Sequence, residues 1–226
     1  MAAPACVAVL ASGGGSNLQA LLDHEAHAGN AYRVVLAASD RAGAGALGRA
    51  AARRVATAHL ADVRDADAML ALLRAHGADL VVLAGYLRLV PAAVTRAFAG
   101  RMLNVHPALL PAFGGPGMYG LRVHAAVIAA GARVSGPTVH FVDEEYDRGA
   151  IAAQWPVPVR PDDTPERLAA RVLAAEHRLL PRTLAHVARG TLVLGADGRA
   201  HARAGADLSD LCFAPGGDGA GRVPVA

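Results

Sequence analysis

Two polar side chains stand two positions apart in an otherwise apolar run, Leu103-Asn104-Val105-His106-Pro107. In a strand, alternation would place Asn104 and His106 on one face, and Pro107 would end the strand because it lacks an amide hydrogen. A carboxamide can donate to a developing oxyanion, and a neutral imidazole can take up or return a proton near pH 7. The spacing therefore predicts a catalytic pair at a strand end. A buried histidine with satisfied hydrogen bonds is the structural alternative.

The residue types that are missing narrow the chemistry. No serine or cysteine lies near the pair in sequence, which favours direct attack by a substrate amine over a covalent enzyme intermediate. The chain has no lysine, so all 22 basic residues are arginine. This excludes a Walker phosphate loop and Schiff-base chemistry through a lysine amine, including that of pyridoxal phosphate. His24 and His27 share a predicted helix face, but no third ligand is placed beside them, so no metal is expected.

A second candidate site is the loop Ser12-Gly13-Gly14-Gly15-Ser16-Asn17, between a predicted strand and a predicted helix. Glycines let a ligand approach the backbone, and a helix N-terminus presents free N–H groups with partial positive charge. The loop therefore predicts a cradle for phosphate or carboxylate. Two alternatives are a tight turn that binds nothing and a dinucleotide site. Against the second, position 18 is leucine instead of the third glycine, and Asp40 is only a loose match for the acidic residue.

The apolar patterning predicts which elements hold these loops. Short apolar runs, typical of strands buried on both faces of a parallel sheet, cover residues 6–11, 34–38, 80–84 and 102–105. Segments with helical periodicity lie between them, at 17–27, 44–54, 66–76 and 92–98. This alternation predicts an α/β fold with a mostly parallel, open twisted sheet and helices on both faces.

The regular alternation of predicted strands and helices ends after Val105. A loop rich in proline and glycine leads to further predicted elements, which are a helix at 121–131, strands at 138–142, 150–157 and 191–194, and a long helix at 164–189. Residues from 195 onward are rich in Gly, Ala and Asp without periodicity. We therefore predict one domain over 1–194, with the phosphate site in its N-terminal half, and a poorly ordered tail over 195–226.

Composition limits the class of protein. The 226 residues are 54% hydrophobic and 18% charged, and charges or histidines interrupt each apolar run before it could span a bilayer. The N-terminus lacks the basic segment of a signal peptide, and two cysteines cannot form a disulfide framework. The net charge of +3 comes from scattered arginines with only 4% aromatic residues, so no nucleic-acid site is expected. These features predict a cytoplasmic protein that binds small molecules and no membrane.

Three segments together resemble one known family. Asn104 to Pro111 (NVHPALLP), Ser12 to Gln19 (SGGGSNLQ) and Thr138 to Gly149 (TVHFVDEEYDRG) are similar to signatures of the phosphoribosylglycinamide formyltransferases, folate-dependent enzymes of purine synthesis. The resemblance covers about residues 5–194. It implies a formyltransferase fold with a Rossmann-like N-terminal half and a folate site in the C-terminal half. It also implies transfer of a formyl group from 10-formyltetrahydrofolate to the amine of glycinamide ribonucleotide.

The resemblance implies roles for single residues. Asn104 would steady the formyl oxygen, His106 would move the proton at the reacting amine, and Asp147 would complete the catalytic group, with His140 as a supporting partner. A carboxylate near an imidazole raises the pKa of the imidazole and can relay a proton through water. The residues implied to bind the ribonucleotide are Gly15, Ser16, Asn17, Leu173 and Glu176. Those implied to bind folate are Arg64, Leu87, Arg88, Leu89, Val90, Asn104, Asp143, Glu144, Glu145, Tyr146 and Asp147.

The chain departs from the family pattern in two places. The loop over 113–120 is longer and richer in glycine than is common, which bears on how substrate is gated. Leu173 is apolar where many members carry a polar residue. Within the acidic loop, a solvated turn is the simpler interpretation of Glu144 and Glu145.

Other functions use the same pattern. A 10-formyltetrahydrofolate hydrolase would let water attack at the same half-site, but such relatives usually have a domain before the first strand. A methionyl-tRNA formyltransferase typically adds a C-terminal tRNA-binding domain. A non-enzymatic nucleotide-binding module would leave Asn104, His106 and Asp147 unexplained. Of these functions, formyl transfer explains the largest number of the residues named above. We also expect the protein to be a monomer or a weak homodimer.

Overall fold

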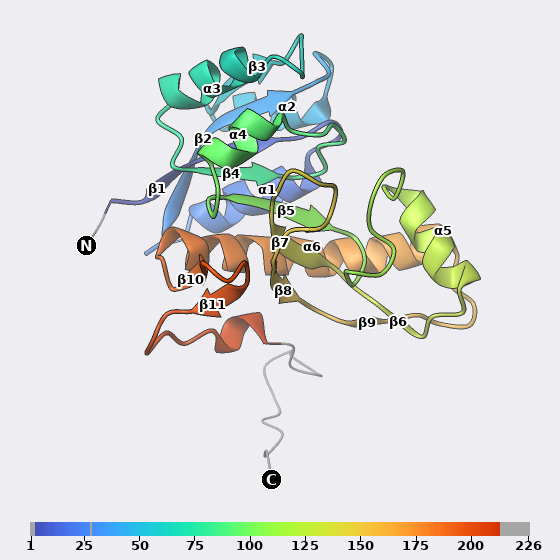
Figure 1. The fold of residues 1–226 in the computed structure, drawn as a ribbon. Helices are drawn as coiled ribbons and strands as arrows, with labels where there is room; N and C mark the ends of the chain where they lie inside the picture. The colour runs from blue at the N-terminus through green and yellow to red at the C-terminus, as the bar shows by residue number, and fades with distance from the viewer. Residues whose placement is uncertain (1–2, 28, 213–226) are drawn as a thin grey trace.

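The fold is built around one seven-stranded sheet (Figure 1). The computed structural model describes residues 3–27 and 29–212. The strands of the sheet, in spatial order, are β3 (Ala56–His59), β2 (Tyr32–Ser39), β1 (Ala5–Leu10), β4 (Leu80–Leu83), β5 (Met102–His106), β7 (Thr138–Phe141) and β8 (Ile151–Gln154). The first five pair in parallel, and β7 and β8 pair antiparallel. The predicted mostly parallel sheet is confirmed.

Helices cover both faces of the sheet, as predicted. One face is covered by α1 (Ser16–Glu25), α2 (Gly45–Ala52) and α6 (Pro165–Ala188), and the other by α3 (Ala66–Ala75) and α4 (Ala92–Ala97). The remaining α-helix of the described residues, α5 (Leu121–Ala129), lies to the side of the sheet in Figure 1. Its Val127 packs against Leu168 and Val172 of α6.

Strand β1 shows why its run is apolar without interruption. Val7 and Val9 face the core on the α1 and α6 side, whereas Ala8 and Leu10 face the core on the α3 and α4 side. Each of these four side chains is completely buried. A central strand of a doubly covered sheet needs apolar side chains on both faces, so the alternation of an exposed strand disappears.

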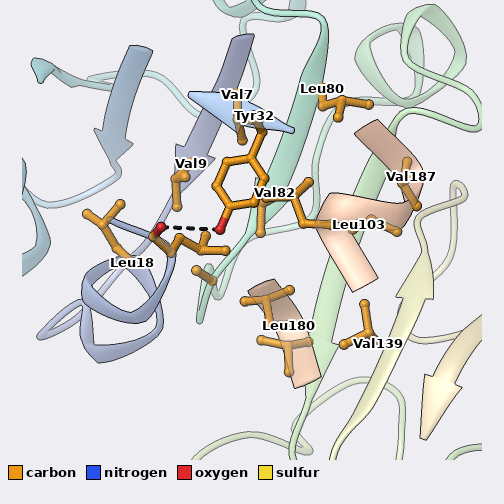
Figure 2. Close-up of a cluster of buried hydrophobic side chains, with 14 of the residues drawn as sticks. Val7, Val9, Leu18, Tyr32, Leu80, Val82, Leu103, Val139, Leu180 and Val187 are labelled. Carbon is orange, nitrogen blue, oxygen red and sulfur yellow. Dashed lines mark hydrogen bonds between the residues drawn. The ribbon is translucent and has the colours of Figure 1, made fainter. Parts of the chain in front are cut away.

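The larger core lies between the sheet and the helices α1 and α6. Figure 2 shows Val9 and Leu103 from the strands close to Leu180 of α6. Tyr32, from the start of β2, extends into the same layer, and its buried hydroxyl donates to the carbonyl of Leu21 at 3.2 Å. This bond satisfies the one polar atom that the tyrosine brings into the core.

Helix α6 agrees with the predicted long helix. Thr164 is its N-cap and accepts a hydrogen bond from the amide of Arg167, and Pro165 occupies the first turn, where its missing N–H has no cost. The buried stripe of α6 is apolar except for three polar residues, Glu176, Thr183 and His186. The helix therefore carries a carboxyl group into the interior of the domain.

Two elements differ from the sequence pattern. The short edge strand β3 was not predicted, because Ala56 and Thr57 are exposed and give no apolar run. The single strand predicted over 150–157 is two strands, β8 and β9 (Val157–Pro158), and β9 pairs with β6 (Val134–Ser135) outside the main sheet. Pro156 lies at the break and cannot donate to a ladder.

The first part of the predicted tail is ordered. β10 (Leu192–Leu194) forms a hairpin with β11 (Ala200–Ala202), followed by a 3-10 helix, η1 (Ser209–Leu211). Leu211 is buried in the main core, and its carbonyl accepts a hydrogen bond from the indole of Trp155 at 2.8 Å. The prediction of a poorly ordered tail therefore does not hold up to Cys212, and its remainder, 213–226, lies outside the described residues.

Candidate active site

Asn104 and His106 lie at the carboxyl end of β5, and β7 pairs with β5 so that Asn104 is opposite His140. The loop after β7 brings in Asp147, whose carboxylate lies 3.4 Å from His106 Nδ1 and 3.6 Å from His140 Nε2. The structure thus gathers the three predicted catalytic residues and the predicted supporting histidine at one point. We call Asn104, His106, His140 and Asp147 the Asn104 cluster.

The hydrogen bonds assign the donors around Asn104. His140 Nδ1 lies 2.8 Å from the carbonyl oxygen of Phe141, which can only accept, so Nδ1 carries the hydrogen and Nε2 has the lone pair. Asn104 Nδ2 donates to this lone pair at 3.0 Å and to Asp147 Oδ1 at 3.3 Å. Both amide hydrogens of Asn104 are therefore engaged, and the longer bond is the one to the carboxylate.

His106 has the opposite arrangement. Its Nε2 lies 2.8 Å from the carbonyl oxygen of Phe113, so Nε2 carries a hydrogen and Nδ1 faces Asp147. Burial lowers the pKa of His106 below its usual value, although the Asp147 carboxylate and the Phe113 carbonyl act in the opposite direction. The imidazole is therefore neutral at pH 7, with the lone pair of Nδ1 directed to a carboxylate. If Nδ1 took up a proton, the resulting imidazolium would be stabilised by the Asp147 carboxylate and by the Phe113 carbonyl.

Asp147 is fixed by the loop over 113–120. The amide of Gly115 donates to Asp147 Oδ2 at 2.9 Å. Burial raises the pKa of the Asp147 carboxyl, but its contacts with His140, His106 and this amide outweigh burial and leave the pKa below its usual value. Asp147 also has a φ of 57°, which residues other than glycine rarely adopt. The backbone thus holds a charged carboxylate over the strand end.

A cavity of about 570 Å³ opens onto the Asn104 cluster. Its lining residues come from the segment after β4, from the end of β5 and from the start of α1. These segments lie next to the point where the strand order reverses between β1 and β4. Open α/β sheets bind ligands at this position. The predicted site residues in its lining are Asn17, Leu87, Arg88, Leu89, Val90, Asn104, His106, His140, Asp143, Glu145, Tyr146, Asp147, Leu173 and Glu176. The two halves of the sequence therefore contribute to one cavity.

Four predicted site residues do not line this cavity: Gly15, Ser16, Arg64 and Glu144. Arg64 is exposed in the turn before α3. Glu144 points to Arg96 of α4, with an ion pair of 2.8 Å. The structure therefore places Glu144 at the surface of the acidic loop.

The glycine loop is shaped by Gly15, which precedes α1 with a φ of 75°. A Cβ at this position would lie 2.6 Å from the Cα of Ala46 in α2, so only glycine fits. Gly13 and Gly14, in contrast, have open space beside them. No side chain caps the N-terminus of α1, so its first N–H groups are available to an anion.

Asn17 and Glu176 connect the glycine loop to the cavity. Asn17 Nδ2 donates to Glu176 Oε2 at 2.6 Å, and both side chains are buried. Burial raises the pKa of the Glu176 carboxyl, although the hydrogen bond from Asn17 acts in the opposite direction. Asn17 Oδ1 is buried and has no partner among the described residues. This pair therefore offers unfilled hydrogen-bonding capacity to a ligand hydroxyl.

Residues 115–121 and His124 of α5 form one wall of the cavity. The sequence analysis connected the loop over 113–120 with substrate gating, but it named no site residue there and missed His124. His124 is buried, and its Nδ1 has no partner in the described part of the chain. Burial, followed by the nearby His106, lowers the pKa of His124. A histidine between Val123 and Val127 on the apolar face of the predicted helix was the available signal.

Two further findings concern the described residues only. Within 3–27 and 29–212, no three or more His, Cys, Asp or Glu side chains are grouped as metal ligands would be. In that same part of the chain, no helix is long and apolar enough to cross a membrane.

The fold and the cavity define a class, an α/β domain with a ligand site at the reversal of strand order and a polar cluster on the neighbouring strand. The family model for formyl transferases matches residues 5–184. The chain belongs to this family and has its fold.

Similar proteins carry one recurring name. Phosphoribosylglycinamide formyltransferase of Mycobacterium tuberculosis is 44% identical over 199 residues, which are 85% of this chain and 90% of that protein. The chloroplastic phosphoribosylglycinamide formyltransferase of Arabidopsis thaliana is 46% identical over 76% of this chain, and the chain spans only 62% of that plant protein. The solved structure of glycinamide ribonucleotide transformylase 1 from Symbiobacterium toebii has a TM-score of 0.81 and 40% identity, covering 88% of this chain and 94% of that one.

A more distant structural neighbour has another title. A formyltetrahydrofolate deformylase from Pseudomonas syringae has a TM-score of 0.78 at 25% identity, covering 89% of this chain and 66% of that one. The fold is therefore shared by solved structures whose titles name a transformylase and a deformylase.

Proposed function

We propose that the protein transfers the formyl group of 10-formyltetrahydrofolate to the amine of glycinamide ribonucleotide. One observation carries the proposal: a single cavity joins the Asn104 cluster to the Asn17–Glu176 pair beside the glycine loop. A carbonyl substrate and a phosphorylated amine can therefore meet there. The names of the relatives support the choice of these two substrates.

The reaction exchanges one C–N bond for another. The substrate amine attacks the formyl carbon, a tetrahedral oxyanion forms, and the bond from that carbon to the folate nitrogen breaks. One proton leaves the attacking nitrogen, and one is delivered to the departing folate nitrogen. No residue of the protein is covalently modified, and no metal or redox step is required.

His106 is the group proposed to carry the proton. Its Nδ1 lone pair is available in the neutral form, and Asp147 lies 3.4 Å away, so the imidazolium formed by protonation is stabilised by a charged carboxylate. The bond from Nε2 to Phe113 fixes the tautomer that exposes this lone pair. His106 therefore acts as base for the amine and then, as imidazolium, as acid for the leaving nitrogen.

Asn104 is proposed to stabilise the oxyanion. Its two amide hydrogens are both used, but the 3.3 Å contact to Asp147 is the weaker one. A formyl oxygen can replace Asp147 Oδ1 as the acceptor, while the shorter bond to His140 keeps the amide in orientation. His140 is thus a positioning residue in this mechanism.

The binding assignments follow the two ends of the cavity. At the α1 end, Asn17, Leu173 and Glu176 line the cavity, and Gly15 and Ser16 lie just outside its lining. The backbone of Gly15, Ser16 and Asn17 is proposed to hold the phosphate, and Glu176 with Leu173 to contact the ribose. At the other end, residues 87–90 and the loop 143–147 are proposed to hold the pterin. Arg64 is proposed to interact with the glutamate portion of folate outside the cavity lining.

Hydrolysis of 10-formyltetrahydrofolate is the second candidate, and the likeness to the deformylase favours it specifically. The deciding experiment follows release of the folate product by absorbance, with and without glycinamide ribonucleotide. Transfer predicts release only when the ribonucleotide is present. Release at the same rate without it would replace transfer by hydrolysis.

Three further expectations belong to the same proposal. The protein is proposed to be cytoplasmic, which its free cysteines Cys6 and Cys212 support. The formyltransferase domain is proposed to be residues 1–194, which contain every residue assigned above to binding or to the reaction. The protein is proposed to be a monomer or a weak homodimer with small-molecule substrates alone, which sedimentation at several protein concentrations tests.

A further inference from the structure

A second cavity, of about 590 Å³, lies between α1, α2 and α6. It shares no lining residue with the active-site cavity, but Ser16, proposed above to hold the ribonucleotide phosphate, lies at its proximal end. Three arginines and three histidines make up most of its lining. We call this site the cationic groove and define it by six of its residues, His24, His27, Arg49, His177, Arg178 and Arg182.

The charges of the groove are not balanced from within. Its one acidic lining residue in the described chain is Asp23, and that carboxylate is bound from outside the groove by Arg53 at 2.5 Å. Arg49 donates to the carbonyl of Gly14 at 2.8 Å, which holds it beside the glycine loop. Arg178 makes no hydrogen bond or ion pair within the described residues and lies over the ring of Trp155. The groove therefore has a net positive charge.

The imidazoles of the groove have unused capacity. His177 Nε2 is fully buried and has no hydrogen-bond partner in the described part of the chain. His24 stacks on Tyr32, with the ring centroids 5.7 Å apart, and its Nδ1 contacts the Tyr32 hydroxyl at 3.3 Å. His27 lies 5.9 Å from His24, ring to ring. The planes of the two imidazoles are tilted by 46°. Arg182 of the neighbouring helix α6 lines the same groove, lies over the Trp155 ring and donates to the carbonyl of Asp210 at 3.2 Å.

We propose that the distal part of the cationic groove, between His24, His27 and Arg182, binds an oxyanion of the phosphate class. This site is separate from the cradle at the N-terminus of α1. His24 follows Ser16 by eight residues, which corresponds to about 12 Å along the helix. One phosphate group cannot bridge that distance. The proposal does not depend on formyl transfer, because it uses none of the residues assigned to the reaction centre.

The pH dependence follows from the groups that face His24. Burial lowers the pKa of His24 most, and the charges of His27, Arg189 and Arg182 lower it further, while Asn30 acts in the opposite direction. A bound anion stabilises the imidazolium and therefore raises that pKa. Binding is accordingly coupled to proton uptake and weakens as the pH rises from 6 to 8.

Sulfate is the suitable probe, because its charge does not change over this pH range. Calorimetric titration of the full chain with sulfate, at constant ionic strength, is expected to show two sites. The double substitution Arg182→Gln and His27→Gln is expected to weaken one site about tenfold and to leave the other unchanged. Arg167→Gln removes the same charge from α6 at an ion pair with Asp162 outside the groove, and it is expected to change neither site.

The outcomes separate the possibilities. Unchanged sulfate binding in the double variant, or an equal loss in Arg167→Gln, would each overturn the proposal. A single sulfate site in the wild type supports the proposal if the double substitution weakens that site, and overturns it if the site is unchanged. Should the double variant unfold, His27→Gln alone tests it, since His27 is exposed and contacts only the carbonyl of His24 in the α1 segment by hydrogen bond. The single variant must then weaken one site and leave the other unchanged.

Competition identifies the source of the phosphate. Inorganic phosphate and ribose 5-phosphate are each titrated against bound sulfate in wild type and in the double variant. Tighter displacement by the sugar phosphate at the groove indicates a phosphorylated metabolite as the ligand. Equal displacement indicates a site for free phosphate. If the protein did not catalyse formyl transfer, both outcomes of this competition experiment would still identify the ligand of the groove.

Discussion

The glycine loop and the Asn104 cluster lie at the carboxyl ends of parallel strands in one sheet, yet they are built in different ways. The loop binds through backbone, with Gly15 pressed against Ala46 and the first N–H groups of α1 uncapped. The cluster works through side chains, and each of its donors already has an acceptor. The first site is complete before a ligand arrives, whereas the second must exchange hydrogen bonds during the reaction. Substitutions should therefore act on folding and binding at the loop, and on turnover at the cluster.

The largest effect is expected from truncation in the cluster. His106→Ala or Asn104→Ala should lower kcat by at least about 10²–10³, because each removes a group that stabilises charge or moves a proton in the transition state. Steady-state formyl transfer with thermal unfolding as a control measures this. Near wild-type turnover in either folded variant would reject the catalytic assignment.

A second, smaller effect is expected from Asp147→Asn. The carboxylate raises the pKa of His106 against the lowering by burial, so its removal lowers that pKa further. The rate should fall about 10²-fold, because the imidazolium loses its partner. Turnover requires neutral His106, so activity declines as the pH drops through its pKa. The acid limb of the pH–rate profile should therefore move to lower pH in the variant.

The matched control is Asp162→Asn, which removes an exposed carboxylate paired with Arg167 away from the cavity. It should reproduce the wild-type profile. An acid limb that stays in place in Asp147→Asn would mean that His106 does not titrate under the influence of this carboxylate.

Sequence reasoning succeeded where a local pattern dictates geometry. The alternation in Leu103 to Pro107 was enough to put Asn104 and His106 on one face, and periodicity located α6 to within a residue at each end. It failed where partners are distant. Nothing near Phe113 in the sequence indicates that its carbonyl fixes the tautomer of His106, and nothing in Glu144 indicates that it turns toward Arg96. Such contacts depend on how loops fold over the sheet.

The comparison can also be tested from the loop. Gly15→Ala should destabilise the protein by about 1–3 kcal/mol, because it forces a side chain into a left-handed conformation against Ala46. Gly13→Ala is the matched control, since a Cβ there meets nothing within 4 Å. Thermal or denaturant unfolding measures the difference. Equal stability of the two variants would show that Gly15 is not under steric constraint.

The smallest effect concerns Glu176, where the two regions meet. Its pKa is raised in the folded protein, so folding favours the protonated form. The stability that this group contributes is present below its usual pKa of 4.5 and is lost as the pH rises through the folded value. Glu176→Gln keeps an acceptor for Asn17 without the buried charge. The stability of the variant relative to the wild type should therefore increase as the pH rises, with a change in Tm of a few degrees.

Glu166, on the same helix, provides a control of opposite sign. Hydrogen bonds from its own amide and from Thr164 lower the pKa of this exposed carboxyl. Its contribution to stability is present above 4.5 and is lost on acidification. As the pH rises, the stability of Glu166→Gln relative to the wild type should therefore decrease, whereas that of Glu176→Gln should increase. If both variants changed in the same direction, burial would not govern Glu176. The carboxyl at the junction of the two sites would then be solvated and ionised like one at the surface.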